Sequence, residues 1–197
     1  MKSEQRKKHI LDAALNAFAE NGYERTSISV ICSRAGIARP TLYQYFKDKR
    51  SLFRELLEGY LAQVHEIIHA KQQAKDKNKA FSEREAMQSV HEELLKEFVS
   101  NRDFFTIIFK EAKARNAETE DIVKGMMQAM VKELIDEMRL HPGFEAMGEE
   151  DIQFIVLYMI GGMMQIVESY LFDEDKTLSF QEVAKRITNI EARIKGI

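Results

Sequence analysis

The sequence predicts an all-α protein. Only 2 prolines and 9 glycines occur among 197 residues, so few positions force a helix to end, unlike in turn-rich all-β chains. Apolar residues recur at spacings of three and four through most of the chain, which is the period of amphipathic helices. Hydrophobic residues make up 45% and charged residues 31%, as in a globular chain with a sizeable core. We expect about nine helices.

Three helices are expected in the first 50 residues. The first ends at Gly22, because glycine readily adopts the left-handed conformation of a helix C-cap. Thr26 is expected to be the N-cap of the second helix. Pro40 fits the first turn of the third, where its missing N–H costs nothing, and Leu42 and Phe46 are expected to face the core. The expected ranges are 5–20, 26–35 and 40–46.

Six longer helices are expected after Asp48, which begins an apolar face of nearly six turns. Residues 71–79 lose this periodicity and are interpreted as a linker or a frayed helix end. Ser82 and Ser179 each open a capping box. The segment 152–172 is apolar on nearly all sides, so we expect it to be covered all round. The expected ranges are 48–70, 82–98, 102–114, 118–140, 152–172 and 179–197.

Charge divides the chain into two parts. Residues 1–54 carry 11 lysines and arginines against 5 acidic residues, a net charge of +6, whereas the remaining residues carry −9. This asymmetry predicts a polyanionic partner for the N-terminal part alone. The two short helices 26–35 and 40–46, joined by a glycine-containing turn, are typical of a helix-turn-helix, whose second helix enters the major groove of DNA.

The stretch from Ile31 to Phe53, ICSRAGIARPTLYQYFKDKRSLF, resembles the TetR family of bacterial transcriptional regulators. The agreement extends over about residues 5–54 through Ala13-Ala14-Leu15, Phe18, Gly22-Tyr23 and Thr26-Ser27. Ala38 departs from the family, which usually has a capping side chain there, and Cys32 replaces a common alanine. The resemblance implies a DNA-binding domain over 1–54 and a ligand-binding and dimerisation domain over 55–197, joined by the long helix 48–70.

The resemblance also implies which side chains meet DNA. Phosphate contacts are expected from Thr26, Thr41, Tyr43 and Lys49, because cations and hydroxyls neutralise or bond the backbone. Arg39 can pair with guanine, Gln44 with adenine, and Pro40 can contact a thymine methyl. The alternative for Tyr43 and Tyr45 is packing against the next helix. The full expected set is Thr26, Ser27, Arg39, Pro40, Thr41, Tyr43, Gln44, Tyr45 and Lys49.

Large, adaptable side chains concentrate in the acidic part of the chain. They fit either a filled core or a cavity for an apolar ligand. The resemblance favours a cavity, and implies a repressor without enzymatic activity or cofactor that a small, largely apolar effector releases from DNA. The residues expected to line the cavity are Phe105, Phe109, Met126, Met127, Met130, Tyr158, Met159 and Met163.

A homodimer is expected, because one recognition helix reads only a few base pairs and two would read a palindrome with half-sites ~34 Å apart. The last two helices are expected to pair across the dimer, although the heptad spacing of the last one also permits a partner within the chain. A charged residue at Ile187 or Ile190 is expected to leave monomers. The expected interface residues are Val167, Phe180, Val183, Ile187, Ile190 and Ile194.

The segment His65-Glu66-Ile67-Ile68-His69 matches H-E-x-x-H, in which two histidines one helical turn apart bind zinc and the glutamate is a general base. A metal-binding protein or metallopeptidase is therefore the alternative function. The third ligand of the extended motif is absent, since Gln72 and Lys75 stand where glycine and histidine would be. We favour two ordinary histidines and no metal.

A single cysteine, Cys32, is typical of a protein of the reducing cytoplasm. Its place in the helix-turn-helix favours a small buried side chain, and a redox switch is the alternative. The longest uncharged run, residues 152–167, has 16 residues, which is short of the ~20 that span a bilayer. We therefore expect a cytoplasmic protein with no membrane partner and no secretory signal.

Overall fold

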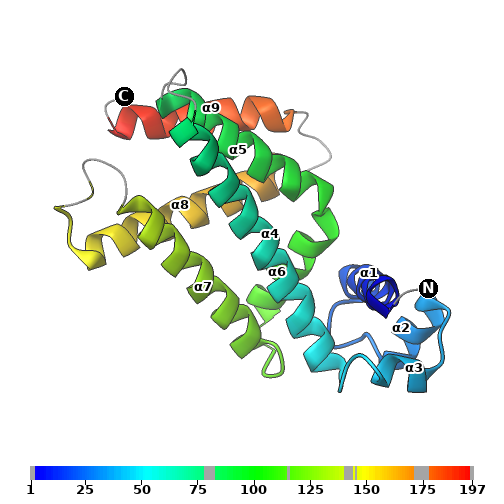
Figure 1. The fold of residues 1–197 in the computed structure, drawn as a ribbon. Coiled ribbons are helices and arrows are strands. Elements are labelled where there is room, and N and C mark those ends of the chain that lie inside the picture. Colours follow the sequence, from blue (N-terminus) through cyan, green and yellow to red (C-terminus); the bar gives the residue numbers. More distant parts are fainter. Residues whose placement is uncertain are drawn as a thin grey trace. The chain divides into compact units, whose positions relative to one another are not determined.

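The computed structural model describes residues 3–77, 83–114, 116–139, 144, 146–170 and 178–195. Within these residues the chain forms nine helices and no strand, which confirms the predicted all-α class (Figure 1). The helices are α1 (Ser3–Asn21), α2 (Ile28–Ala35), α3 (Arg39–Tyr43), α4 (Lys49–Lys77), α5 (Glu83–Ser100), α6 (Arg102–Ala114), α7 (Glu120–Met138), α8 (Glu149–Tyr170) and α9 (Phe180–Lys195).

The helices group into two compact units. The first unit comprises residues 1–61 and 103–128, and the second comprises 62–102 and 129–197. The helix-turn-helix segment therefore shares its unit with most of α6 and the first part of α7, which lie far from it in sequence. Helix α4 begins in the first unit and ends in the second.

An aromatic cluster fills the core of the first unit. The rings of Phe18 and Tyr23 stack with centroids 5.5 Å apart, and both meet Phe53 of α4 edge-on. Leu42 and Phe46 are buried, as the sequence predicts. The ring contacts join α1 to the start of α4, and the buried side chains of Leu42 and Phe46 anchor α3 and the turn after it in the interior.

Polar contacts tie α6 to the helix-turn-helix segment. The buried carboxylate of Glu111 accepts hydrogen bonds from the Tyr23 backbone N–H at 3.1 Å and from the Thr119 hydroxyl at 3.0 Å. Lys110 donates to the carbonyl of Ala19 near the end of α1, at 2.8 Å. A carbonyl in the last turn of a helix has no partner within the helix, so the lysine stabilises the end of α1.

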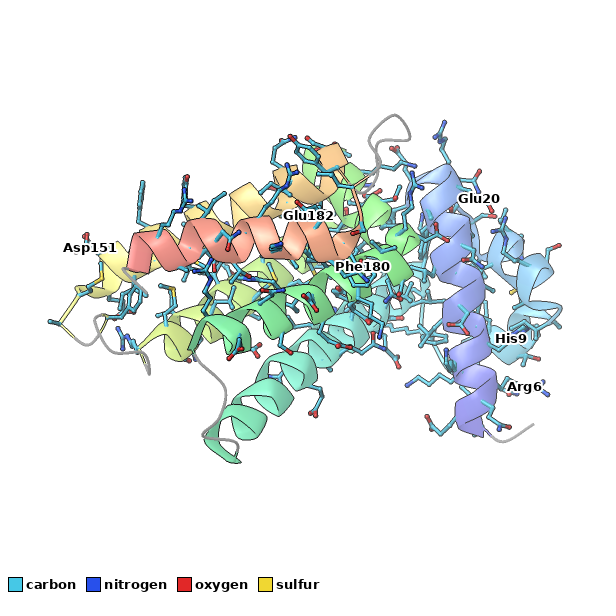
Figure 2. The ribbon with its side chains drawn as sticks, turned by 90° about the horizontal axis from the view of Figure 1, so that it is seen from above. Arg6, His9, Glu20, Asp151, Phe180 and Glu182 are labelled. Carbon is cyan, nitrogen blue, oxygen red and sulfur yellow. The ribbon has the colours of Figure 1, made fainter. Side chains whose placement is uncertain are left out.

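In the second unit, α5 and α9 lie side by side (Figure 1). Their contact includes buried apolar residues and two polar contacts. The ring of buried His91 contacts the Thr188 hydroxyl at 2.8 Å and the Glu191 carboxylate at 3.2 Å, and the Arg84 guanidinium donates to the side-chain carbonyl of Asn189. Phe180 lies at the start of α9 and packs against the apolar cluster (Figure 2). The buried members of that cluster are Leu95, Val167, Val183, Ala184 and Ile187.

Several predicted boundaries are wrong, among them the start of α8, which begins at Glu149 instead of Ile152. Helix α4 continues to Lys77 instead of ending at Ala70, because the Lys, Gln and Ala residues that follow are good helix formers even without an apolar face. Helix α2 begins at Ile28 and its N-cap is Ser27, not Thr26. Helix α3 ends at Tyr43 rather than at Phe46. The predicted capping residue Ser82 lies outside the described residues.

The expectation that the segment 152–172 is covered all round is also wrong for the single chain. Helix α8 buries Ile152, Val156, Ile160 and Val167, but its opposite side leaves three large apolar residues exposed. The exposed fractions are 74% for Phe154, 49% for Leu157 and 71% for Tyr158.

Helix α8 is long and apolar enough to cross a membrane, judged by length and composition alone. It is the one such helix in the described part of the chain.

Candidate nucleic-acid interface

Two backbone features place α2 and α3. The Ser27 hydroxyl accepts a hydrogen bond from the Val30 N–H at 3.4 Å and caps α2, which ends at Gly36 with a φ of 61°. Only glycine adopts this left-handed conformation without strain, and the N–H of Ile37 then returns to the Cys32 carbonyl at 3.0 Å. The chain thereby turns sharply between the two helices.

Proline starts α3 without a capping side chain. Ala38, at the N-cap, makes no side-chain hydrogen bond, and Pro40 occupies the first turn. The helix is short because its backbone hydrogen bonds at the end span three residues. The N–H of Gln44 bonds to the Thr41 carbonyl at 3.3 Å, and the N–H of Tyr45 bonds to the Leu42 carbonyl at 2.9 Å. Such three-residue spacing is typical of a terminal turn.

Four predicted DNA-binding residues lie exposed on and beside α3: Arg39, Pro40, Tyr43 and Gln44. The exposed fraction of Tyr43 is 52%, so about half of this side chain is open to solvent. The Arg39 guanidinium hydrogen-bonds to the Ser29 hydroxyl of α2. The guanidinium of Arg39, the phenol of Tyr43 and the amide of Gln44 therefore lie together on one short helix and its C-cap. Such groups bind base edges and phosphates.

Of the other predicted DNA-binding residues, Ser27 is exposed at the N-cap of α2, and the rest are less exposed. Thr41 is half-buried, and so is Tyr45, whose ring centroid lies 6.5 Å from that of Phe46. The Nζ of half-buried Lys49 donates to the Tyr23 carbonyl at 3.0 Å and lies 4.0 Å from the centroid of the Tyr23 ring. Burial raises the pKa of Tyr23, so this phenol stays neutral beneath the lysine.

Thr26 is an internal residue, with 1% of its surface exposed. Its hydroxyl lies 3.0 Å from the Ala17 carbonyl and 2.8 Å from the Gly22 carbonyl, so it holds the end of α1 to the segment that leads into α2. A threonine before Ser27 thus supports the helix-turn-helix from within.

Thr26→Val is expected to lower the free energy of unfolding by about 1–3 kcal/mol, because the same volume is kept while a buried carbonyl loses its donor. Urea denaturation of the full chain measures the loss. Thr26→Ser, which keeps the hydroxyl, serves as the control and should stay closer to wild type. Equal stability of Thr26→Val and wild type would contradict the structural role.

Asp48 starts α4 directly after the recognition segment. Its carboxylate accepts a hydrogen bond from the Ser51 backbone N–H at 2.6 Å, and the Ser51 hydroxyl bonds back to the Asp48 carbonyl at 2.9 Å. The bond from the Ser51 backbone is the main reason that the pKa of Asp48 is lowered. The ionised carboxylate therefore fixes the start of α4, where Lys49 stands.

The outer side of α2 carries a feature that the sequence reasoning missed. Ser29, Val30, Ser33 and Arg34 line a shallow depression of about 400 Å³. Arg34 is held there by Glu20 of α1, at 2.8 Å, and Glu20 lies near the opposite end of α1 from Arg6 and His9 (Figure 2). The available signal was the four-residue spacing of Ser29 and Ser33, which puts two hydroxyls on one side of α2.

Cys32 packs in the interior, with 4% of its surface exposed. Burial raises the pKa of this thiol, so the reactive thiolate is disfavoured. The redox-switch alternative therefore receives no support from the structure, which makes Cys32 a packing residue in the core beneath α2.

The predicted effector residues divide between the two units. Phe105, Met126 and Met127 belong to the first unit, where Phe105 is buried with its ring edge-on to Tyr60. The second unit holds the other described members, of which Tyr158 is exposed and the methionines are half-buried: Met130, Tyr158, Met159 and Met163. The side chain of Phe109 lies outside the described residues. The effector cavity stays a prediction.

Most predicted dimer residues pack inside their own chain. Val167, Val183 and Ile187 are buried members of the apolar cluster in the second unit, and Phe180 packs on it. Ile190 is 57% exposed, and the side chain of Ile194 lies outside the described residues. A charge at Ile187 would therefore disrupt this core as well as any interface, so it does not test dimerisation selectively.

The H-E-x-x-H segment lies on α4. Nδ1 of His65 is 2.6 Å from a carboxylate oxygen of Glu133 on α7, and the exposed fraction of the His65 side chain is 50%. The side chain of His69 lies outside the described residues. In the part of the chain that the structure describes, no three His, Cys, Asp or Glu side chains gather as a metal-binding group.

The family model described as "Bacterial regulatory proteins, tetR family" matches residues 10–56, which contain most of α1, all of α2 and α3, and the start of α4. This part of the chain is similar to the TetR family. Among curated relatives, the fatty acid metabolism regulator protein of Bacillus subtilis is 42% identical over 72 residues, which are 34% of this chain and 37% of that protein. The regulator AcrR of Shigella flexneri is 37% identical over 33% of this chain and 30% of its own length.

These two alignments span about a third of the relatives' length. Solved structures extend the likeness of fold to almost the whole chain. The fatty acid degradation regulator FadR from Bacillus halodurans has a TM-score of 0.75 at 18% identity, with 96% of both chains covered. FadR from Bacillus subtilis, solved in complex with stearoyl-CoA, has a TM-score of 0.72 at 18% identity and covers 96% of this chain and 98% of its own.

Proposed function

We propose that this chain is a ligand-responsive transcriptional repressor of the TetR family, without enzymatic activity, that binds a palindromic operator as a dimer. The observation that best supports this function is a group of four exposed residues on and beside α3: Arg39, Pro40, Tyr43 and Gln44. Buried Leu42 and Phe46 anchor this short helix and the turn after it. Within the basic segment 1–54, this group supplies both base-reading and phosphate-binding chemistry. Thr41 and Lys49 flank it as further phosphate-binding candidates.

The exposed side of α8 supports the dimer. Phe154, Leu157 and Tyr158 are followed at helical spacing by Gly161 and Gly162, which are also exposed. A Cβ added at either glycine would meet no atom of the chain within 4 Å, so packing inside the chain does not require glycine there. Exposed apolar side chains beside small residues favour close approach by a second copy, and Ile190 of α9 adds a further exposed apolar residue.

The effector we propose is a small molecule with a large apolar part. Phenylalanine and methionine side chains recur in α6, α7 and α8, and such adaptable side chains suit acyl chains. The stearoyl-CoA bound to Bacillus subtilis FadR and the name of the related fatty acid metabolism regulator make a long-chain acyl thioester the first candidate. Its binding would favour the conformation that does not fit the operator, to the extent that its affinity for the two conformations differs.

Selection of bound sequences from random duplex DNA tests this function. We expect an inverted repeat whose half-sites are centred about one helical turn, ~34 Å, apart or a multiple of that distance. The selected duplex is then challenged with stearoyl-CoA, which should release it, whereas free coenzyme A should not. Failure to enrich any sequence, together with no affinity for duplexes at low ionic strength, would contradict DNA binding.

A further inference from the structure

Lys49, the first residue of α4, is a half-buried cation held by neutral groups. Its Nζ donates to the carbonyl oxygen of Tyr23 at 3.0 Å and lies 4.0 Å from the centroid of the Tyr23 ring. Among the described residues, no carboxylate forms an ion pair with it. A carbonyl dipole and a ring face attract a cation without neutralising it, so the charge stays available to an anion outside the chain.

Neighbouring carboxylates do not pair with Lys49 as one of them does with Arg50. The guanidinium of Arg50 forms an ion pair with Asp121. The carboxylate of Asp48, adjacent to Lys49 in sequence, accepts the backbone N–H of Ser51 at 2.6 Å. A paired cation attracts a phosphate less strongly, because a negative charge lies beside it. Of these two adjacent cations, Lys49 is therefore the better phosphate ligand.

Tyr23 is a rigid support for this ammonium. The residue is 1% exposed, and its ring contacts the rings of Phe18 and Phe53 at centroid distances of 5.5 and 5.0 Å. Its backbone N–H donates to the buried carboxylate of Glu111 at 3.1 Å. Separate contacts thus hold the ring and the backbone of Tyr23, and both of these parts contact Lys49.

We propose that Tyr23 positions the ammonium of Lys49 for one phosphate of duplex DNA. This role rests on the DNA binding proposed above. A lysine whose end is already fixed on a partner loses less rotamer freedom when it binds. One hydrogen bond to the Tyr23 carbonyl leaves two of the three ammonium donors for phosphate oxygens. Tyr23 itself is buried, so it acts on DNA through Lys49 and is a positioning residue.

The salt dependence of DNA binding tests the phosphate contact. Fluorescence anisotropy of the full chain with a labelled duplex of mixed sequence is measured over a series of salt concentrations. Lys49→Met should make the slope of log K against log salt less steep by about 0.9 for each Lys49 that meets a phosphate. Lys132→Met, which removes an exposed lysine of α7 in the second unit, is the matched control and should keep the wild-type slope.

A wild-type slope in Lys49→Met would overturn the phosphate contact while leaving the DNA-binding function in place. If wild type itself bound no duplex at low ionic strength, the proposed function would fail as well. The two failures are therefore distinguishable.

A double-mutant cycle separates positioning from a purely structural role of Tyr23. Tyr23→Leu removes the ring and keeps the backbone carbonyl, and should weaken duplex binding about 2–5-fold, the strength of one cation–π contact. The same change made in Lys49→Met should have no further effect. Phe18→Leu removes a neighbouring ring of the same core, and its effect should be equal with and without Lys49. Equal effects of Tyr23→Leu in both backgrounds would overturn the positioning role.

A pair of aromatic variants tests the same role without emptying the core, should Tyr23→Leu fail to fold in urea denaturation. Tyr23→Phe keeps the ring face and should bind the duplex like wild type. A trifluorinated phenylalanine in place of Tyr23 keeps the ring but weakens its attraction for a cation, so binding should fall about 2–5-fold. This loss should disappear in Lys49→Met. Equal affinities of the two aromatic variants would contradict positioning by the ring.

Discussion

The double variant Arg39→Ala, Gln44→Ala is expected to bind the selected operator about a hundredfold less tightly than wild type, because each bidentate base contact contributes about 1–3 kcal/mol of discrimination. Both side chains are exposed, and neither belongs to the core beneath α3, so the fold should persist. Fluorescence anisotropy with the labelled operator measures the loss. Affinity for unrelated duplex should fall much less, since only one cation is removed.

The control for this variant is Arg139→Ala, which removes an exposed arginine that pairs with Glu149 in the second unit. It should bind the operator with wild-type affinity. If the double variant retained full operator affinity and sequence preference, α3 would not be the reading helix. An equal loss of affinity for the operator and for unrelated DNA would instead show that Arg39 binds phosphates. Base reading would then not come from Arg39 and Gln44.

Leu157→Glu and Phe154→Glu are each expected to convert the dimer into monomers. A carboxylate buried without a partner at an interface costs about 3–5 kcal/mol, so the dimer dissociation constant should rise by about a thousandfold. Both side chains are exposed in the single chain, 49% for Leu157 and 74% for Phe154, so the monomer should remain folded. Sedimentation equilibrium measures the dissociation constant, and operator affinity should fall with it because one half-site binds weakly.

Gln128→Glu is the matched control, since it places the same charge at an exposed position on α7. It should leave the dimer intact. Dimers that persist in both α8 variants would show that another surface joins the copies. A charged residue at Ile187 cannot replace these variants as a test of dimerisation, because the Ile187 side chain packs in the apolar cluster of its own chain.

Local signals predicted the helix-turn-helix well. Gly36 has a φ of 61°, Pro40 lies in the first turn of α3, and Leu42 and Phe46 are buried. Each of these outcomes depends on interactions within a few residues along the chain, so a single sequence contains the necessary information. The absence of a capping side chain at Ala38 was also visible in the sequence, and the structure shows no side-chain cap there.

Neighbouring capping residues could not be distinguished in the same way. Thr26 and Ser27 are both good N-caps, and the sequence favoured the first. The structure gives the cap to Ser27, because the Thr26 hydroxyl faces the Ala17 and Gly22 carbonyls at the end of α1. The length of α3 was missed for a related reason, since the turn after Tyr43 brings Phe46 into a core shared with other helices.

The sequence by itself determined the helical class, the basic N-terminal segment and the chemistry of α3, because periodicity, charge and turn residues act locally. Tertiary structure alone decided which apolar surfaces are already covered: Val183 and Ile187 face α5, whereas Phe154 and Leu157 face outward. It also decided that Glu111 bonds to Tyr23, 88 positions away in sequence. A helix that is apolar on all sides has no preferred inner face until its neighbours pack against it, so burial and long-range hydrogen bonds are set by the assembled fold.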